Sequence, residues 1–304
     1  MSKNSYSFFV LWYNHVCCLS VRERGKLMIL EVLLDTIEDV LKILPFLFMT
    51  YLLLEWLEQK TEHRFQQILE KQHKMEPLYG ALLGLFPSCG LSGAAGTLFA
   101  TGMIQAGTLA AVYLSTSDEM LAIMISSKAL PGVYLPILAV KFLVGTGAGY
   151  LASLFAKPHR ADIGTFCERE HDDHSHGVLY SALQHTLQIT AWLFIITLLF
   201  NIIIELIGLD HIQYFIESHT GSSVLVSTLA GMIPSCASSI VLTRMYLDGM
   251  LSFAAVTAGL LANAGTGMMV LFRVNPNHKE NLQILSYVWI VSLVSGYLLQ
   301  WILG

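Results

Sequence analysis

Apolar residues run in long stretches with few polar interruptions along most of the chain. Each stretch has roughly the 20 residues that a helix needs to cross the hydrocarbon layer of a bilayer. Tryptophans stand mostly near the ends of the stretches, where the membrane meets water. The expected segments are 29–57, 78–101, 103–127, 131–156, 178–207, 221–246, 248–272 and 283–303. The pattern predicts an all-α polytopic membrane protein.

Two of these segments contain a proline motif: Phe86-Pro87-Ser88-Cys89-Gly90 and Ile233-Pro234-Ser235-Cys236-Ala237. Proline removes a backbone donor and clashes with the preceding turn of a helix. At membrane depth, such breaks are tolerated only where the freed backbone groups line a cavity or a site. We therefore expect broken helices or re-entrant hairpins here, with helix-breaking residues at Pro87, Gly90, Pro234 and, further on, Gly265.

The two halves of the chain are copies of each other. Pro87-Ser88-Cys89 recurs 147 residues later as Pro234-Ser235-Cys236, and Gly149-Tyr150-Leu151 recurs as Gly296-Tyr297-Leu298. The offset needs no gap across that stretch and becomes 150 upstream of it. The expected organisation is an N-terminal extension at 1–27 that precedes a plausible start at Met28, repeats at 28–156 and 178–304, and a cytoplasmic linker at 157–177.

Loop charges predict that the copies are inverted. The loop 58–76 carries four basic residues, whereas its counterpart 208–220 carries neither lysine nor arginine. Because basic loops stay cytoplasmic, the two loops lie on opposite sides of the membrane. Inverted copies need an odd number of spans each, so one of the four segments per copy fails to cross. Inverted repeats with interrupted helices are typical of secondary transporters.

Composition narrows the functional classes. Hydrophobic residues make up 54% of the chain, charged residues 13%, and mean hydropathy is +0.59. A soluble globule of 304 residues would need about twice that share of charges. The net charge of −5 offers no basic surface for nucleic acid. The sequence contains no phosphate-binding GxxxxGK[ST] motif and no HExxH motif, so we expect neither ATP hydrolysis nor an intramembrane metalloprotease.

The strongest candidate site is Ser115-Thr116-Ser117-Asp118-Glu119, which lies within an apolar segment. Polar groups at such depth are costly and mark functional paths. Hydroxyl and carboxylate oxygens suit a hard divalent cation, Mn²⁺ or Mg²⁺; the alternative is a short surface loop between two helices. The second copy carries Ala262-Asn263-Ala264-Gly265-Thr266, which keeps the small polar character without the charge. This pattern predicts two half-sites, with Asn263 and Thr266 in the neutral one.

Further candidate ligands follow from matched positions. Cys89 and Cys236, with Ser88 and Ser235, form a thiol and hydroxyl set for a soft metal or arsenite, unless the cysteines are simply small buried residues. Asp35 and His185 match at offset 150 and are ordinary ligands of first-row metals, unless Asp35 merely favours a helix N-terminus. The linker residues are weaker candidates for metal capture: His171, Asp172, Asp173, His174 and His176. Lys141 is expected to snorkel to the surface or to pair with a carboxylate.

These motifs resemble a bacterial family described as manganese transporters, arsenic efflux proteins or ten-helix heavy-metal exporters. The resemblance covers nearly all of 28–304. It rests on these stretches: Asp35-Thr36, Leu44-Pro45-Phe46-Leu47-Phe48, Phe86-Pro87-Ser88-Cys89-Gly90, Thr116-Ser117-Asp118-Glu119, Ile233-Pro234-Ser235-Cys236 and Leu271-Phe272-Arg273-Val274-Asn275. Many members have glycine where Ser88 and Ser235 stand, and a more acidic motif where Gly265-Thr266 stands. The resemblance implies a metal or oxyanion exporter with ten helices.

The expected function is therefore efflux of a divalent heavy-metal cation, Mn²⁺ first, by a multi-pass carrier in the bacterial inner membrane. Alternating access between the repeats would move the ion, with no resident cofactor and no enzymatic activity. Partners are the cargo ion and the lipid bilayer, and a homo-oligomer is compatible with the sequence. Two alternatives stay open: an arsenite or other oxyanion permease that uses the paired cysteines, and a membrane subunit of a larger complex.

Overall fold

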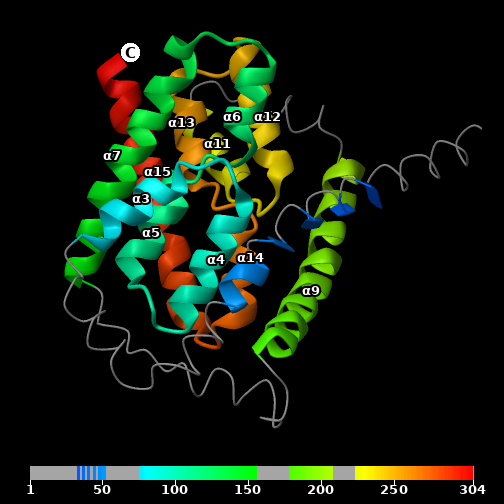
Figure 1. Ribbon diagram of the computed structural model, residues 1–304. Coiled ribbons are helices and arrows are strands. Elements are labelled where there is room, and N and C mark those ends of the chain that lie inside the picture. The colour runs from blue at the N-terminus through cyan, green and yellow to red at the C-terminus, as the bar shows by residue number, and fades with distance from the viewer. Residues whose placement is uncertain are drawn as a thin grey trace, which may run out of the picture.

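The computed structural model describes residues 75–155, 178–207 and 223–303, together with part of the stretch 33–52. The described residues between 33 and 52 are helical. The first repeat continues with α3 (Glu76–Gly84), α4 (Cys89–Ala100), α5 (Ala106–Ser115), α6 (Asp118–Ser126) and α7 (Pro131–Phe155). The second contains α9 (Val178–Ile207), α11 (Ser223–Gly231), α12 (Cys236–Leu247), α13 (Phe253–Ala262), α14 (Gly267–Val274) and α15 (His278–Leu303). The described chain is thus all-helical, as the apolar pattern predicts (Figure 1).

The helices repeat as closely as the sequence does. Helices α3, α4 and α5 begin and end 147 residues before α11, α12 and α13. Their turns repeat too, because Gly102 and Gly249 follow α4 and α12 with φ of 75° and 76°, a left-handed conformation that glycine adopts without strain. The backbone amide after each glycine donates to a carbonyl in the last turns of the helix before it. The Met103 amide donates to the Leu98 carbonyl at 2.8 Å, and the Met250 amide donates to the Met245 carbonyl at 2.9 Å. The duplication is therefore structural.

Helices α3 and α4 form a re-entrant hairpin. Gly80 lies against Thr108 and Gly84 lies against Ser115, so α3 runs parallel to α5 and ends at the same level. Helix α4 must return from that level to the start of α5. Its 12 residues cover about 18 Å, little more than half of the hydrocarbon layer. Pro87 stands between the two helices, so its segment does not cross the membrane, and α11–Pro234–α12 repeats the arrangement.

The two repeats are inverted. Gly107 lies against Ser153, so α5 begins at the level where α7 ends. A pocket at this level is lined by Ala106 of α5, Phe155 of α7 and Asn277, just before α15. Helix α15 thus starts on the membrane face where α7 finishes, although the two helices hold matching places in their repeats. This antiparallel pairing confirms the inversion that the loop charges predict.

Short helices of each repeat pack against the other repeat. Helix α4 packs against α14 of the second repeat, and α12 packs against α6 of the first. Small residues allow the backbones to approach closely: a Cβ added at Gly267 would lie 2.6 Å from the Ser92 carbonyl oxygen, and one at Gly96 would lie 3.2 Å from that of Gly267. The interior of each half is therefore completed by the other half.

The outer helices carry the surface for lipid. Among the residues that the structure describes, four helical stretches are long and apolar enough to cross a membrane: Ala106–Ser126, Pro131–Phe155, Phe253–Val274 and His278–Leu303. Leu154 and Trp301, on α7 and α15, are 78% and 83% exposed, which suits contact with acyl chains and with the membrane interface. Helices α7 and α9 flank opposite sides of the central helices (Figure 1).

Some expectations need correction or lie beyond the described residues. Gly90 does not break a helix, because it lies within the first turn of α4, where the break has already ended. The extension 1–27 and the linker 157–177, with its histidine and aspartate residues, lie outside the described residues. Those boundaries stay predictions.

Candidate functional site

Two breaks in helices meet in the middle of the bundle. The first separates α5 from α6 at Thr116 and Ser117, and the second separates α13 from α14 at 263–266. The Tyr113 hydroxyl, fully buried near the end of α5, donates a 2.8 Å hydrogen bond to the carbonyl of Gly267, the first residue of α14. The two interrupted helices are thereby joined across the repeats.

The first break is anchored to the tip of its own hairpin. The Ser117 hydroxyl donates to the Leu85 carbonyl at 2.7 Å, and the Ser117 amide donates to the Gly84 carbonyl at 3.2 Å. The Thr116 hydroxyl donates to the Val112 carbonyl at 2.7 Å. Both side chains are at most 3% exposed. Because each hydroxyl uses its proton for a carbonyl, its oxygen lone pairs remain able to accept a hydrogen bond or to coordinate a cation.

The acidic residues follow directly. Asp118 is the first residue of α6, although its side chain lies outside what the structure describes. Glu119 is partly buried and stands one residue further into α6. A carboxylate at a helix N-terminus is stabilised by the orphan amides of the first turn. The backbone thus places the acidic pair at the level of the break, and the alternative of a short surface loop is excluded for buried Thr116 and Ser117.

The second break is neutral and differently held. Asn263 donates from its side-chain nitrogen to the Ser238 hydroxyl at 3.2 Å, and its side-chain oxygen accepts from the Gly265 amide at 2.8 Å. Gly265 has φ of 57°, which allows the tight turn between α13 and α14. The hydroxyl of Thr266, a residue only 1% exposed, has no hydrogen-bond partner among the described residues. An orphaned buried hydroxyl suggests room for a ligand or water.

Lys141 does not take the surface position that was one of the two expectations for it. It is 1% exposed, so it does not snorkel to the surface. Its ammonium group donates a 2.5 Å hydrogen bond to the carbonyl of Leu260, in the last turn of α13. One turn away on α7, Gly145 faces Ser115 at the end of α5. The side chain therefore starts beside the first break and ends at the second.

The hairpin tips hold the paired cysteines. Cys89 and Cys236 begin α4 and α12 and are 5% and 3% exposed. Both belong to one buried cluster that also contains Met103 and Met269. Ser88 is half-buried, whereas Ser235 is buried and its hydroxyl accepts from the Ala237 amide at 3.2 Å. The tips thus bring sulfur atoms of both repeats into one apolar region.

Other predicted ligands are not placed at this site. Asp35 lies outside the described residues, and His185 lies in α9 with a side chain that is not described. Within the described ranges, no three side chains of histidine, cysteine, aspartate or glutamate come together as a metal-binding group. A cation held by this part of the chain would therefore take hydroxyl and backbone oxygens as well as carboxylates.

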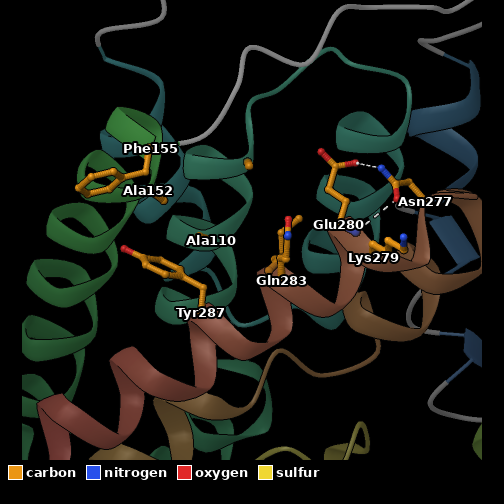
Figure 2. Close-up of a pocket in the computed structure, with 10 residues that line it drawn as sticks. Ala110, Ala152, Phe155, Asn277, Lys279, Glu280, Gln283 and Tyr287 are labelled. Atoms are coloured by element: carbon orange, nitrogen blue, oxygen red, sulfur yellow. Dashed lines mark hydrogen bonds between the residues drawn. The ribbon is translucent and has the colours of Figure 1, made fainter.

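A pocket of about 650 Å³ opens at the membrane face where α7 ends and α15 begins. Phe155 and Tyr287 stand on one side of it, and Asn277, Lys279 and Glu280 stand on the other (Figure 2). The Tyr287 hydroxyl donates to the Ala148 carbonyl at 2.6 Å. At the positions that match Ala106 and Ala152 of this pocket, the second repeat has Phe253 and Leu299, which pack against a hydrophobic cluster.

Three residues of this centre were not singled out as site residues from the sequence: Tyr113, Lys141 and Ser238. The signal that marks them is a mismatch between copies. Tyr113 matches Leu260, Lys141 matches Val288 and Ser238 matches Leu91. A polar residue where the other copy has an apolar one indicates a function beyond the shared scaffold.

Comparison with known families gives one finding. A family model described as "Putative, 10TM heavy-metal exporter" matches residues 28–178 and 175–303. The two matches cover nearly the whole chain and divide it close to the boundary between the repeats. Comparisons with curated proteins and with solved structures find no match.

Proposed function

The chain belongs to the heavy-metal exporter family, and from this premise we propose that it exports a divalent cation, Mn²⁺ first, by alternating access between its two repeats. The observation that carries the proposal is the meeting of two interrupted helices, one of which begins its second part with Asp118 and Glu119. Mn²⁺ prefers carboxylate, hydroxyl and carbonyl oxygens, which are the groups that the first break supplies.

We assign binding of the ion to Asp118 and Glu119, with the oxygens of Thr116 and Ser117 as further ligands. The buried hydroxyl of Thr266 and the Asn263 side chain would complete the site from the second repeat. No resident cofactor is needed, since the metal is cargo. An ion held between two inverted repeats becomes accessible from either face when one repeat rocks against the other.

The pocket beside Tyr287 is proposed as the mouth through which cargo reaches the breaks. It lies on the face where α7 runs toward the linker 157–177, which the sequence places in the cytoplasm. At the matching positions of the second repeat stand Phe253 and Leu299, which pack against a hydrophobic cluster. This asymmetry supports a carrier open toward the cytoplasm of a bacterial inner membrane, ready to take up a metal for export.

Flux into proteoliposomes tests this function. Purified protein is reconstituted with a metal-sensitive dye inside the vesicles, and Mn²⁺, Zn²⁺ and Fe²⁺ are compared. We expect Mn²⁺ flux in the wild type and a loss of about 100-fold in D118N/E119Q, because both metal-binding charges are gone while the shape of the side chains is kept. Normal folding of the variant is checked by its melting temperature.

D248N is the matched control, since Asp248 is exposed and follows α12 at the end far from Ser238, away from the breaks and from the pocket. Its flux is expected to stay within about twofold of the wild type, as for a surface substitution. Equal flux by wild type and D118N/E119Q would refute the assigned site. No flux of any divalent cation would refute the cation-export function.

A thiophilic cargo is the second candidate, and the shared cluster of Cys89, Cys236, Met103 and Met269 favours it. Thiolate and thioether groups select soft metals, and thiolates bind arsenite covalently. In this case arsenite flux would survive D118N/E119Q and disappear in C89A/C236A. The same pair of variants therefore separates the two cargo classes in one assay.

A further inference from the structure

We propose that the end of α13 is a second cation site, and that the ammonium group of Lys141 is its built-in occupant. The carbonyl groups in the last turn of a helix have no amide partners within the helix and carry partial negative charge. Leu260 lies in that turn of α13, which ends at Ala262. Its carbonyl instead accepts from Lys141, which reaches across from the other repeat.

The burial of Lys141 requires such a partner. An ammonium group removed from water is strongly unfavourable unless oxygens replace its hydration shell. Lys141 is 1% exposed, in a helix that otherwise faces lipid and apolar neighbours. The chain keeps this cation inside by giving it the carbonyl end of a broken helix, which is the kind of group that binds free cations in transporters with interrupted helices.

The second repeat confirms that the lysine is not part of the scaffold. Val288 of α15 takes the matching position, is equally buried at 1% exposure, and packs in a hydrophobic cluster with Tyr113 and Leu261. The fold therefore accepts an aliphatic side chain at this place. What Lys141 adds is a charge, directed at the break that lacks acidic residues.

Thr266 is the independent observation that points to a ligand here. Its hydroxyl, 1% exposed, lies at the start of α14 and has no hydrogen-bond partner among the described residues. The Asn263 side-chain oxygen faces the same turn, where it accepts from the Gly265 amide. Oxygens from Leu260, Asn263 and Thr266 thus come from one short break, as ligands for a hard cation do.

A consequence for coupling follows, and it rests on the proposed function. With a tethered ammonium in the second site, the carrier needs no free Na⁺ or K⁺ there. Metal flux by the wild type should therefore be indifferent to gradients of these ions. Removal of the ammonium should open the site to a small cation and make metal flux depend on that cation.

The test uses the whole purified protein and needs no transport. The melting temperature of K141V is measured in choline chloride and then in NaCl, KCl or methylammonium chloride at equal ionic strength. Because a ligand that binds only the folded state stabilises it, we expect a rise of about 5 °C with at least one small cation, whereas wild type and K141R do not respond. K141V/T266V should lose most of that rise.

Every outcome decides the proposal. An unresponsive K141V, or an equal response of the wild type, overturns it. If K141V is not recovered in folded form, K141M replaces it, since methionine keeps the length of the lysine stem. Recovery of folded protein only in a small cation supports the site, whereas equal failure in NaCl and choline chloride assigns Lys141 a purely structural role. The cation-export function fails on a different result, the absence of divalent metal flux in the wild type.

Discussion

The two helix breaks hold matching places in the two repeats, and their chemistry is opposite. The first carries Asp118 and Glu119 after two buried hydroxyl residues, and it is tied to its own hairpin tip through Ser117. The second is neutral, is tied through Asn263 to Ser238 in α12, and receives Lys141 from the other repeat. Duplication thus supplied the scaffold, whereas later substitutions left one break acidic and the other neutral, with a lysine ammonium bonded to the helix end beside it.

Substitutions at the close contacts of α3 with α5, and of α11 with α13, should have the largest effect on stability. A Cβ added at Gly84 would lie 2.7 Å from the Val112 carbonyl oxygen, and one added at Gly231 would overlap the Gly259 carbonyl. G84A and G231A should each lower the free energy of unfolding by about 3 kcal/mol, measured by denaturation in mixed micelles. G147A is the control, because nothing lies within 4 Å of its Cβ, and alanine favours a helix. Equal stability of G84A and G147A would contradict the described packing.

Loss of the Tyr113 hydrogen bond, which joins the two breaks, should have the next largest effect on stability. Y113F removes the hydroxyl that donates to the Gly267 carbonyl, and that carbonyl keeps only the amide partner that helix geometry supplies within α14. A loss of about 1.5 kcal/mol in the free energy of unfolding is expected. Y113L places the residue of the matching position 260 there and should cost at least as much. A phenylalanine variant as stable as the wild type would mean that this bond does not join the repeats.

Placing a residue of the first break at the matching position of the second tests how the second break is held. N263T introduces the residue that the first repeat has at the matching position 116. The variant loses both the bond to Ser238 and the cap on the Gly265 amide, so we expect about 1 kcal/mol less stability. S238A removes the acceptor for Asn263 together with the Ser238 hydroxyl's own bonds to the carbonyls of Ile233 and Ser235, so its loss by the same unfolding measurement should be at least as large. A neutral N263T would show that Asn263 does not hold the turn.

The smallest effect is expected at the mouth of the pocket. Tyr287 is only partly buried, so water can replace its hydroxyl as a donor to the Ala148 carbonyl. Y287F should therefore cost about 0.5 kcal/mol, near the lower end for a hydrogen bond. Its matching residue is Val140, so Y287V tests the same site with the side chain of the other repeat. A loss as large as that of Y113F would show that the pocket is more closed than described.

Much of the fold was predictable because its signals are local. Long apolar stretches give helices that cross a membrane, and the prolines at 87 and 234 interrupt them where α4 and α12 restart. The repeat at offset 147 was readable as spacing alone, and the loop charges gave its inversion. The break at Thr116 and Ser117 was also predicted as a polar interruption in an apolar segment.

Other features depended on contacts between distant parts of the chain. The sequence marked Lys141 as an intramembrane charge, but it did not show that the ammonium group is buried and donates to a backbone carbonyl 119 residues away. Backbone acceptors carry no sequence signature. In the same way, the sequence does not distinguish Tyr113 from other aromatic residues, because its partner, the Gly267 carbonyl, comes from α14 of the other repeat.

Sequence alone was enough to predict a duplicated helical membrane protein with interrupted helices and an acidic pair near one of the interruptions. Periodicity, proline chemistry and copied spacing are properties of short segments, so they survive without a fold. Tertiary packing established that short helices of each repeat pack against the other repeat, that the two breaks meet, and that the Lys141 ammonium bonds the carbonyl end of α13. Those facts arise from packing between surfaces far apart in the chain, where small residues let the backbones approach and burial requires each polar group to find a partner.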